Sequence, residues 1–112
     1  MASSEFSVVA VLYPRKDKAD EVVGLLQEVA QYVKANEPGT LKYEITRSLR
    51  PNKDGTEDIV MLERYKDQQS LKTHGTSETF TGFQKKLAKL DLMRAPMMLK
   101  MVSEKGGFSS RL

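Results

Sequence analysis

The chain has 112 residues with a formal net charge of +3, from 18 basic and 15 acidic side chains. This length suits one domain with one modest core, and the interspersed charges favour a solvated surface over a nucleic-acid-binding stripe. Because the sequence has no cysteine and only one histidine, it excludes disulfides, thiolate nucleophiles and histidine-rich metal sites within one chain.

The first apolar segment covers residues 6–13, a continuous β-branched run that Pro14 stops. This pattern predicts a strand buried on both faces. The run is too short for a signal peptide or a membrane span, and no basic region precedes it. We therefore expect a cytoplasmic protein that has no membrane partner.

Residues 17–36 carry the clearest helical pattern of the sequence. Asp20 and Glu21 lie in the first turns, where the helix dipole favours acids, and Pro38-Gly39 ends the segment. Apolar residues recur at helical spacing at Val22, Leu25, Leu26, Val29, Ala30 and Val33.

Two strands follow, at residues 40–49 and from residue 59 onward. The first alternates Leu41, Tyr43 and Ile45 with polar residues, which predicts one drier face. Residues 51–55 between the strands are rich in turn formers and contain Asp54-Gly55. The two strands should form an antiparallel hairpin.

The last third of the chain predicts two helices and a final strand. Asp67 can cap a short helix that runs through Thr73, with Gly75 as a left-handed stop, and Thr76 or Ser77 can cap a second helix. Pro96 should precede a strand at residues 97–103. The second helix has one apolar stripe, formed by Phe80, Phe83, Leu87 and Leu90. Its lysines Lys85, Lys86 and Lys89 fit a solvent-exposed helix face. We therefore expect no nucleic-acid partner.

The order strand, helix, strand, strand, helix, strand predicts an α+β, ferredoxin-like βαββαβ fold. Its four-stranded antiparallel sheet would have helices on one face. Because the strands at residues 8–13 and 59–62 have no clearly polar side, we expect a second subunit to cover the open face, giving a homodimer. We expect one domain over residues 1–112, with a core at 6–103 and a flexible tail at 104–112.

His74 is the candidate for acid-base chemistry, since histidine titrates closest to neutral pH. The alternative is a helix cap, because the residue lies at a predicted helix end. Tyr43 and Tyr65 can supply a hydroxyl to a substrate, or they can be core tyrosines with the hydroxyl at the rim. For Glu63, within an apolar strand, a structural ion pair with Arg47 is the leading interpretation and proton transfer a minor one.

Methionines cluster near the last strand, at Met93, Met97, Met98 and Met101. Their flexible side chains can line a pocket for a flat hydrophobic ligand, with Phe80 and Phe83 as the opposite wall. Core packing is the alternative for most of these residues. We select Phe80, Phe83, Met97 and Met101 as candidate substrate contacts.

Three segments resemble the antibiotic biosynthesis monooxygenase family of dimeric α/β barrels: EPGTLKYE at 37–44, LERYKD at 62–67, and LKTH at 71–74 followed by SETF at 77–80. With the element order, the resemblance covers roughly residues 6–103. It implies a monooxygenase without cofactor or metal that combines molecular oxygen with a small, flat, polyketide- or quinol-like substrate. His74 would be the base, with Tyr43 or Tyr65 as hydroxyl donor.

The resemblance disfavours the haem-degrading branch of the family. Gln84 falls where those members have the iron-ligating histidine, and the chain has no tryptophan. The alternative to an enzyme is a non-catalytic dimeric ligand-binding or stress-response protein on the same barrel. An enzyme should have His74 facing a closed apolar cavity with a second polar group nearby.

Overall fold

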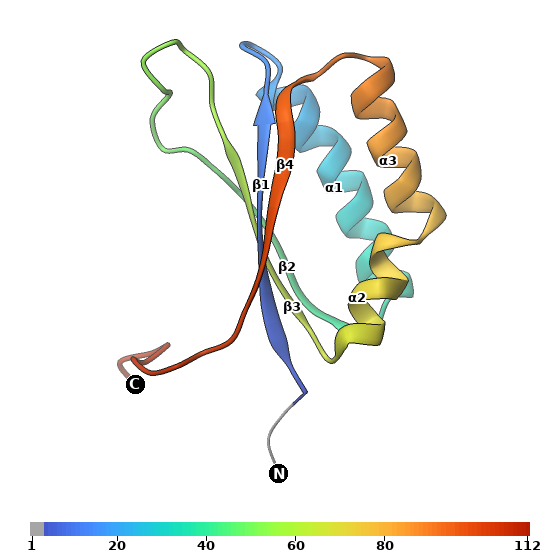
Figure 1. The fold of residues 1–112 in the computed structure, drawn as a ribbon, viewed down its shortest axis with the longest axis vertical. Helices are drawn as coiled ribbons and strands as arrows, with labels where there is room; N and C mark the ends of the chain where they lie inside the picture. The colour runs from blue at the N-terminus through green and yellow to red at the C-terminus, as the bar shows by residue number, and fades with distance from the viewer. Residues whose placement is uncertain (1–3) are drawn as a thin grey trace.

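Four strands form one antiparallel sheet, in the order β2-β3-β1-β4, in the computed structural model, which describes residues 4–112. Figure 1 shows α1, α2 and α3 together on one face of this sheet, while the other face carries no helix. The predicted ferredoxin-like α+β fold is therefore confirmed. The elements are β1 (Phe6–Pro14), α1 (Ala19–Asn36), β2 (Thr40–Arg47), β3 (Ile59–Tyr65), α2 (Gln68–Gly75), α3 (Glu78–Lys89) and β4 (Met93–Val102).

The core lies between the sheet and the helices. One stripe of α1, with Phe83 of α3, packs on the inward residues of β1 and β3. No helix within residues 4–112 is both long and apolar enough to cross a membrane. The main buried members are Ala10, Leu12, Val22, Leu26, Val29, Val33, Ile59, Met61, Phe83 and Leu92.

Strand β1 is buried on one face only. Val8, Ala10 and Leu12 face the helices and are at most 2% exposed, whereas Val9 and Val11, on the opposite face, are half-buried. The predicted burial is therefore found on the face that the helices cover, and burial of the other face, by a second subunit, stays a prediction. Side chains alternate across a strand, and the helices cover only one side.

The β2–β3 hairpin forms as predicted, with Tyr43 opposite Glu63 and Ile45 opposite Met61. Tyr43 and Ile45 pack against the core, but Leu41 is 49% exposed. An irregularity in the pairing between Thr40 and Lys42 interrupts the alternation at that position. The predicted drier face thus begins at Tyr43.

Both predicted helix caps are confirmed. The Asp67 carboxylate accepts a hydrogen bond from the Ser70 amide at 2.8 Å, and the Ser77 hydroxyl accepts one from the Phe80 amide at 3.1 Å. Gly75, however, lies within α2 and has no positive φ, so the predicted left-handed stop is wrong. Gly75 is the last residue of the helix, and Thr76 is its C-cap.

Strand β4 begins at Met93, four residues before the predicted start, and contains Pro96. Proline is tolerated here because β4 is an edge strand that pairs only with β1, so one of its edges needs no hydrogen-bond donors. The pairing register also shifts between Val11 and Tyr13, next to Pro96. Beyond β4, residues 104–112 are exposed and run away from the sheet (Figure 1).

Candidate active site

The imidazole of His74 is buried beneath the helices, with 3% of the residue exposed. Its Nδ1 lies 2.9 Å from Oε1 of Glu37, and its Nε2 lies 3.3 Å from the hydroxyl of Tyr43. The ring therefore does not turn to the carbonyls at the end of α2. The helix-cap alternative for its side chain is wrong, since both ring nitrogens have partners from other elements.

Glu37 is the partner of His74 that the sequence did not reveal. It follows the last residue of α1, and its own amide bonds to the Val33 carbonyl at 2.9 Å. A carboxylate at the C-terminus of a helix faces the negative end of the dipole. That unfavourable position, inside the EPGT segment, was a signal that the side chain has a cationic or N–H partner.

The Glu37 contact orients the histidine. An ionised carboxylate can only accept, so the proton of a neutral imidazole lies on Nδ1 and Nε2 is left as an acceptor. The Tyr43 hydroxyl then donates to Nε2. Burial lowers the pKa of His74, while the Glu37 charge and hydrogen bond partly offset this effect. His74 is thus a neutral acceptor near neutral pH.

Glu63 does not pair with Arg47, contrary to the leading prediction. The sheet register places Arg47 opposite Ile59, four residues from Glu63, or roughly 13 Å along the strand. Arg47 instead bonds to Glu57 and Asp20 at the surface.

The buried partner of Glu63 is Tyr65, whose hydroxyl donates to Oε1 of Glu63 at 2.5 Å. Burial raises the pKa of Glu63 to about 7, an effect that the Tyr65 hydrogen bond partly opposes. Burial also raises the pKa of both Tyr43 and Tyr65. Both phenols therefore stay protonated at neutral pH.

These side chains meet at a cavity of about 60 Å³ between the sheet and the helices. Five predicted site residues line it: His74, Tyr43, Phe80, Phe83 and Met97. The ring of Phe80 lies 4.8 Å from that of His74, between centroids. The lining also includes Ala10, Leu12, Leu26, Met61, Glu63, Leu71, Gly75 and Leu99, so the cavity is largely apolar.

Two predicted site residues lie outside this lining. Tyr65 is fully buried, and its hydroxyl is bound to Glu63. Met101 is 59% exposed and lines a separate surface hollow near Phe6 and Gln68, so its assignment to the same cavity is wrong. Leu99, two residues after Met97 on the same side of β4, takes the place that we expected for Met101.

The cavity is small for a substrate, since ligand pockets usually measure about 300–1,000 Å³. A flat aromatic ring can enter only if side chains move. Met97 and Leu99, on the edge strand, are the residues best placed to do so, because Leu99 is 46% exposed and methionine is flexible.

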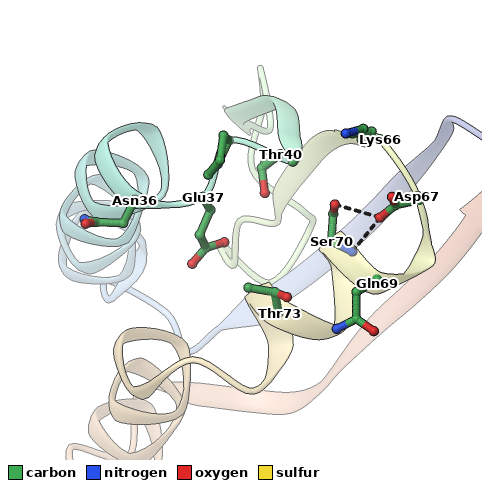
Figure 2. Close-up of a pocket in the computed structure, with 10 residues that line it drawn as sticks. Asn36, Glu37, Thr40, Lys66, Asp67, Gln69, Ser70 and Thr73 are labelled. Carbon is green, nitrogen blue, oxygen red and sulfur yellow. Dashed lines mark hydrogen bonds between the residues drawn. The ribbon is translucent and has the colours of Figure 1, made fainter.

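A larger and more polar groove, of about 350 Å³, lies outside this cavity, where the α1–β2 turn meets α2. Figure 2 shows Lys66, Asp67, Ser70 and Thr73 around it, with Asp67 bonded to Ser70. Glu37 also lines this groove, and its Oε2 is buried without a hydrogen-bond partner. Within residues 4–112, no cluster of three or more histidine, aspartate or glutamate side chains could hold a metal ion.

Comparison with known proteins gives one family and several related structures. The sequence profile described as antibiotic biosynthesis monooxygenase matches residues 5–86. A structure from Caulobacter crescentus, described provisionally as an antibiotic biosynthesis monooxygenase, is 30% identical in sequence and has a TM-score of 0.75. The alignment covers 93% of this chain and 92% of that one. None of the curated proteins matches the chain by sequence.

Two more distant structures share the fold. Rv0793 from Mycobacterium tuberculosis is 23% identical, with a TM-score of 0.74, covering 95% of this chain and all of that one. A conserved protein from Methanosarcina mazei is 21% identical, with a TM-score of 0.73, covering 92% of this chain and 95% of that one.

Proposed function

The chain belongs to the antibiotic biosynthesis monooxygenase family, and we propose that it is a homodimeric monooxygenase that acts without a cofactor on a small, flat, apolar or aromatic substrate. The observation that carries this proposal is the position of His74. A neutral imidazole, held by Glu37, faces an apolar cavity that also contains the Tyr43 hydroxyl.

His74 is the base in this proposal. Its Nε2 accepts from Tyr43 over 3.3 Å, a long bond compared with the 2.9 Å contact on Nδ1. A substrate O–H or activated C–H can take the place of the Tyr43 hydroxyl at Nε2. Removal of that proton gives an electron-rich anion that can pass an electron to molecular oxygen in a dry site.

Tyr43 then serves as the hydroxyl donor. Its raised pKa keeps the phenol protonated, so it can donate to an anionic oxygen of the substrate. Tyr65 is the weaker candidate for this role because its hydroxyl is already bound to Glu63. The apolar walls that Phe80, Phe83 and Met97 supply support an apolar or aromatic substrate.

The homodimer is proposed from the open face of the sheet. On this face Val9, Val11 and Leu62 are apolar and only half-buried, and no helix covers them. Sheet-on-sheet packing with a second copy would bury these side chains and complete a two-layer structure on that side.

The experiment is an oxygen-uptake screen with anthrones, hydroquinones and lipid-derived ketones, comparing the unmodified chain with His74→Ala. We expect uptake with one of these classes and a loss of at least about 100-fold in the variant, the usual contribution of a general base. Lys72→Ala, an exposed change on the same helix, is the matched control. Circular dichroism establishes that both variants are folded. Equal rates in His74→Ala and the control would remove His74 as the base.

A non-catalytic ligand-binding protein is the second candidate, and the apolar lining of the cavity supports it. This candidate predicts that an aromatic ligand such as 1-naphthol binds and shifts the His74 resonance, without oxygen consumption from any substrate class. Oxygen uptake that depends on His74 would exclude it.

A further inference from the structure

Glu63 lines the same cavity as His74 but has no part in the proposed roles of His74 and Tyr43. It lies in the middle of β3, is 7% exposed, and stands directly opposite Tyr43 in the sheet. Its side chain lines the same cavity as the His74 ring. A carboxyl group in such a place must have a hydrogen-bond partner or lose its charge.

Only one of the two carboxyl oxygens of Glu63 is occupied. The Tyr65 hydroxyl donates to Oε1, and Oε2 makes no hydrogen bond within the described residues, 4–112. Among the same residues, no basic side chain forms an ion pair with Glu63. Residues 4–112 therefore give Glu63 no ion-pair role, and one oxygen remains available to a bound molecule.

We propose that Glu63 is a second catalytic residue, a proton donor to the oxygen-derived group, complementary to His74 as base. This inference rests on the proposed monooxygenase function, with molecular oxygen as the oxidant. In this proposal two residues of one cavity transfer protons in opposite directions: His74 accepts a proton from the substrate, and Glu63 donates one to the oxygen-derived group.

The overall reaction converts an activated methylene and one molecule of oxygen into a ketone and one molecule of water. His74 takes the first C–H proton, and the carbanion and oxygen form a C–O bond by electron transfer and recombination. Glu63 then protonates the resulting peroxide anion, which gives a hydroperoxide on the same carbon.

The second half of the reaction restores both residues. The Glu63 carboxylate removes the remaining C–H proton as the C=O bond forms and the O–O bond breaks. The departing hydroxide takes the proton from His74 and becomes water. The carbon loses four electrons and oxygen accepts four, so no reductant is required.

The surroundings of Glu63 suit a proton donor. The groups that influence it or its neighbours are Tyr43 of β2, Tyr65 of β3, and His74 of α2, with Glu37 beside His74. Burial gives Glu63 a pKa of about 7, so the acid form is well populated at neutral pH, while His74 is held neutral. The resting cavity therefore contains an acid and a base together.

The test compares Glu63→Gln with Glu28→Gln, a change at an exposed glutamate on α1. Glutamine keeps an acceptor for the Tyr65 hydroxyl, so the fold should survive. Oxygen uptake is measured from pH 5 to pH 9. In the unmodified chain activity should fall above about pH 7, as Glu63 loses its proton. Glu63→Gln should lower kcat by about 100-fold and remove this alkaline decline.

An unchanged rate with an unchanged alkaline decline in Glu63→Gln would overturn the inference while leaving the monooxygenase function in place. If the unmodified chain consumes no oxygen, the function fails, and with it the peroxide step. In that case, a carbon-13 NMR titration of the Glu63 carboxyl group, with and without 4-methoxyphenol, still tests whether Glu63 contacts a ligand. A shifted carboxyl pKa supports a ligand-facing Glu63, and a pKa that stays unchanged while the His74 resonance moves rejects it.

Discussion

The carboxylate of Glu37 and the imidazole of His74 form a buried pair that joins the end of α1 to α2. Oε1 and Nδ1 are 2.9 Å apart, and the two side chains are only 5% and 4% exposed. Glu37 would be poorly placed at a helix C-terminus without this partner. The pair thus fixes the donor nitrogen of His74 and ties together two helices that frame the cavity.

Glu37→Ala should lower the free energy of unfolding by about 1–3 kcal/mol, because it leaves the buried Nδ1–H without an acceptor. Glu37→Gln should cost less, since its amide oxygen can still accept. Urea unfolding followed by circular dichroism measures both changes. Glu28→Ala, an exposed change on α1, is the control. Equal stability of Glu37→Ala and Glu28→Ala would contradict an energetic role for the pair.

Glu37→Gln should also lower the pKa of His74 further. In the unmodified chain burial lowers this pKa, and the Glu37 charge acts in the opposite direction. Removal of the charge leaves burial unopposed. Because the chain has a single histidine, the Hε1 resonance in an NMR titration reports this pKa without an assignment problem. A higher pKa in the variant would show that the carboxylate does not act on the ring as we describe.

The fold could be predicted from sequence because its signals are local. The alternation around Tyr43, the helical spacing between Val22 and Val33, and the caps Asp67 and Ser77 each depend on neighbours a few residues away. The predicted start of β4 is wrong because the prediction treats Pro96 as a strand boundary. A proline is tolerated within β4 because β4 is an edge strand, and only the assembled sheet reveals that position.

The candidate site was less predictable because it depends on register between distant segments. His74 and Tyr43 were identified from residue type and alternation, but the Glu37–His74 contact joins residues 37 positions apart. The error at Glu63 has the same cause. Pairing it with Arg47 required the β2–β3 register, which places Tyr43 opposite Glu63 instead.

Glu63 should make stability depend on pH. Its pKa rises from 4.5 to about 7 on folding, so the folded state binds the proton more tightly than the unfolded state. The resulting stabilisation, about 3 kcal/mol, is fully present below pH 4.5 and is lost as pH rises through about 7. Glu63→Gln does not titrate. As the pH rises from 4.5 to about 8, the free energy of unfolding of the unmodified chain should therefore fall by about 3 kcal/mol relative to that of Glu63→Gln.

Urea unfolding at several pH values measures this difference, with Glu28→Gln as the control. A difference between Glu63→Gln and the unmodified chain that is constant with pH would mean that the carboxyl pKa is not raised by burial.

Leu62→Lys should separate the proposed homodimer into single chains. Leu62 lies on the open face of the sheet, opposite Glu44 on the neighbouring strand, so a lysine there can pair with Glu44 in one chain. In a sheet-on-sheet interface the same ammonium group would be buried without adequate solvation. Sedimentation equilibrium should give the mass of two chains for the unmodified protein and of one for the variant. Leu90→Lys, at the exposed end of α3, should leave the mass unchanged.

Gly39→Ala should disturb the contact between the turn after Glu37 and α2. A Cβ at this position would lie 2.0 Å from Oγ and 2.6 Å from Cβ of Ser70, so α2 or the turn must shift. We expect a loss of about 1–3 kcal/mol in the free energy of unfolding, as for other overpacked sites. Gly24→Ala is the matched control, because its new Cβ meets no atom within 4 Å. On a helix this change should instead stabilise by about 0.5–1 kcal/mol.

The steric origin of the Gly39 effect can be isolated with Ser70→Gly, which removes both clashing atoms while the Asp67 cap still accepts from the backbone amide of residue 70. The double variant Gly39→Ala/Ser70→Gly should be more stable than the sum of the two single changes predicts, since the clash is absent from it. Its His74 resonance should also return toward the position in the unmodified chain, because α2 carries the ring. Additive losses in urea unfolding, with the resonance still displaced, would show that Gly39 is needed for its backbone conformation and not for the space that it leaves to Ser70.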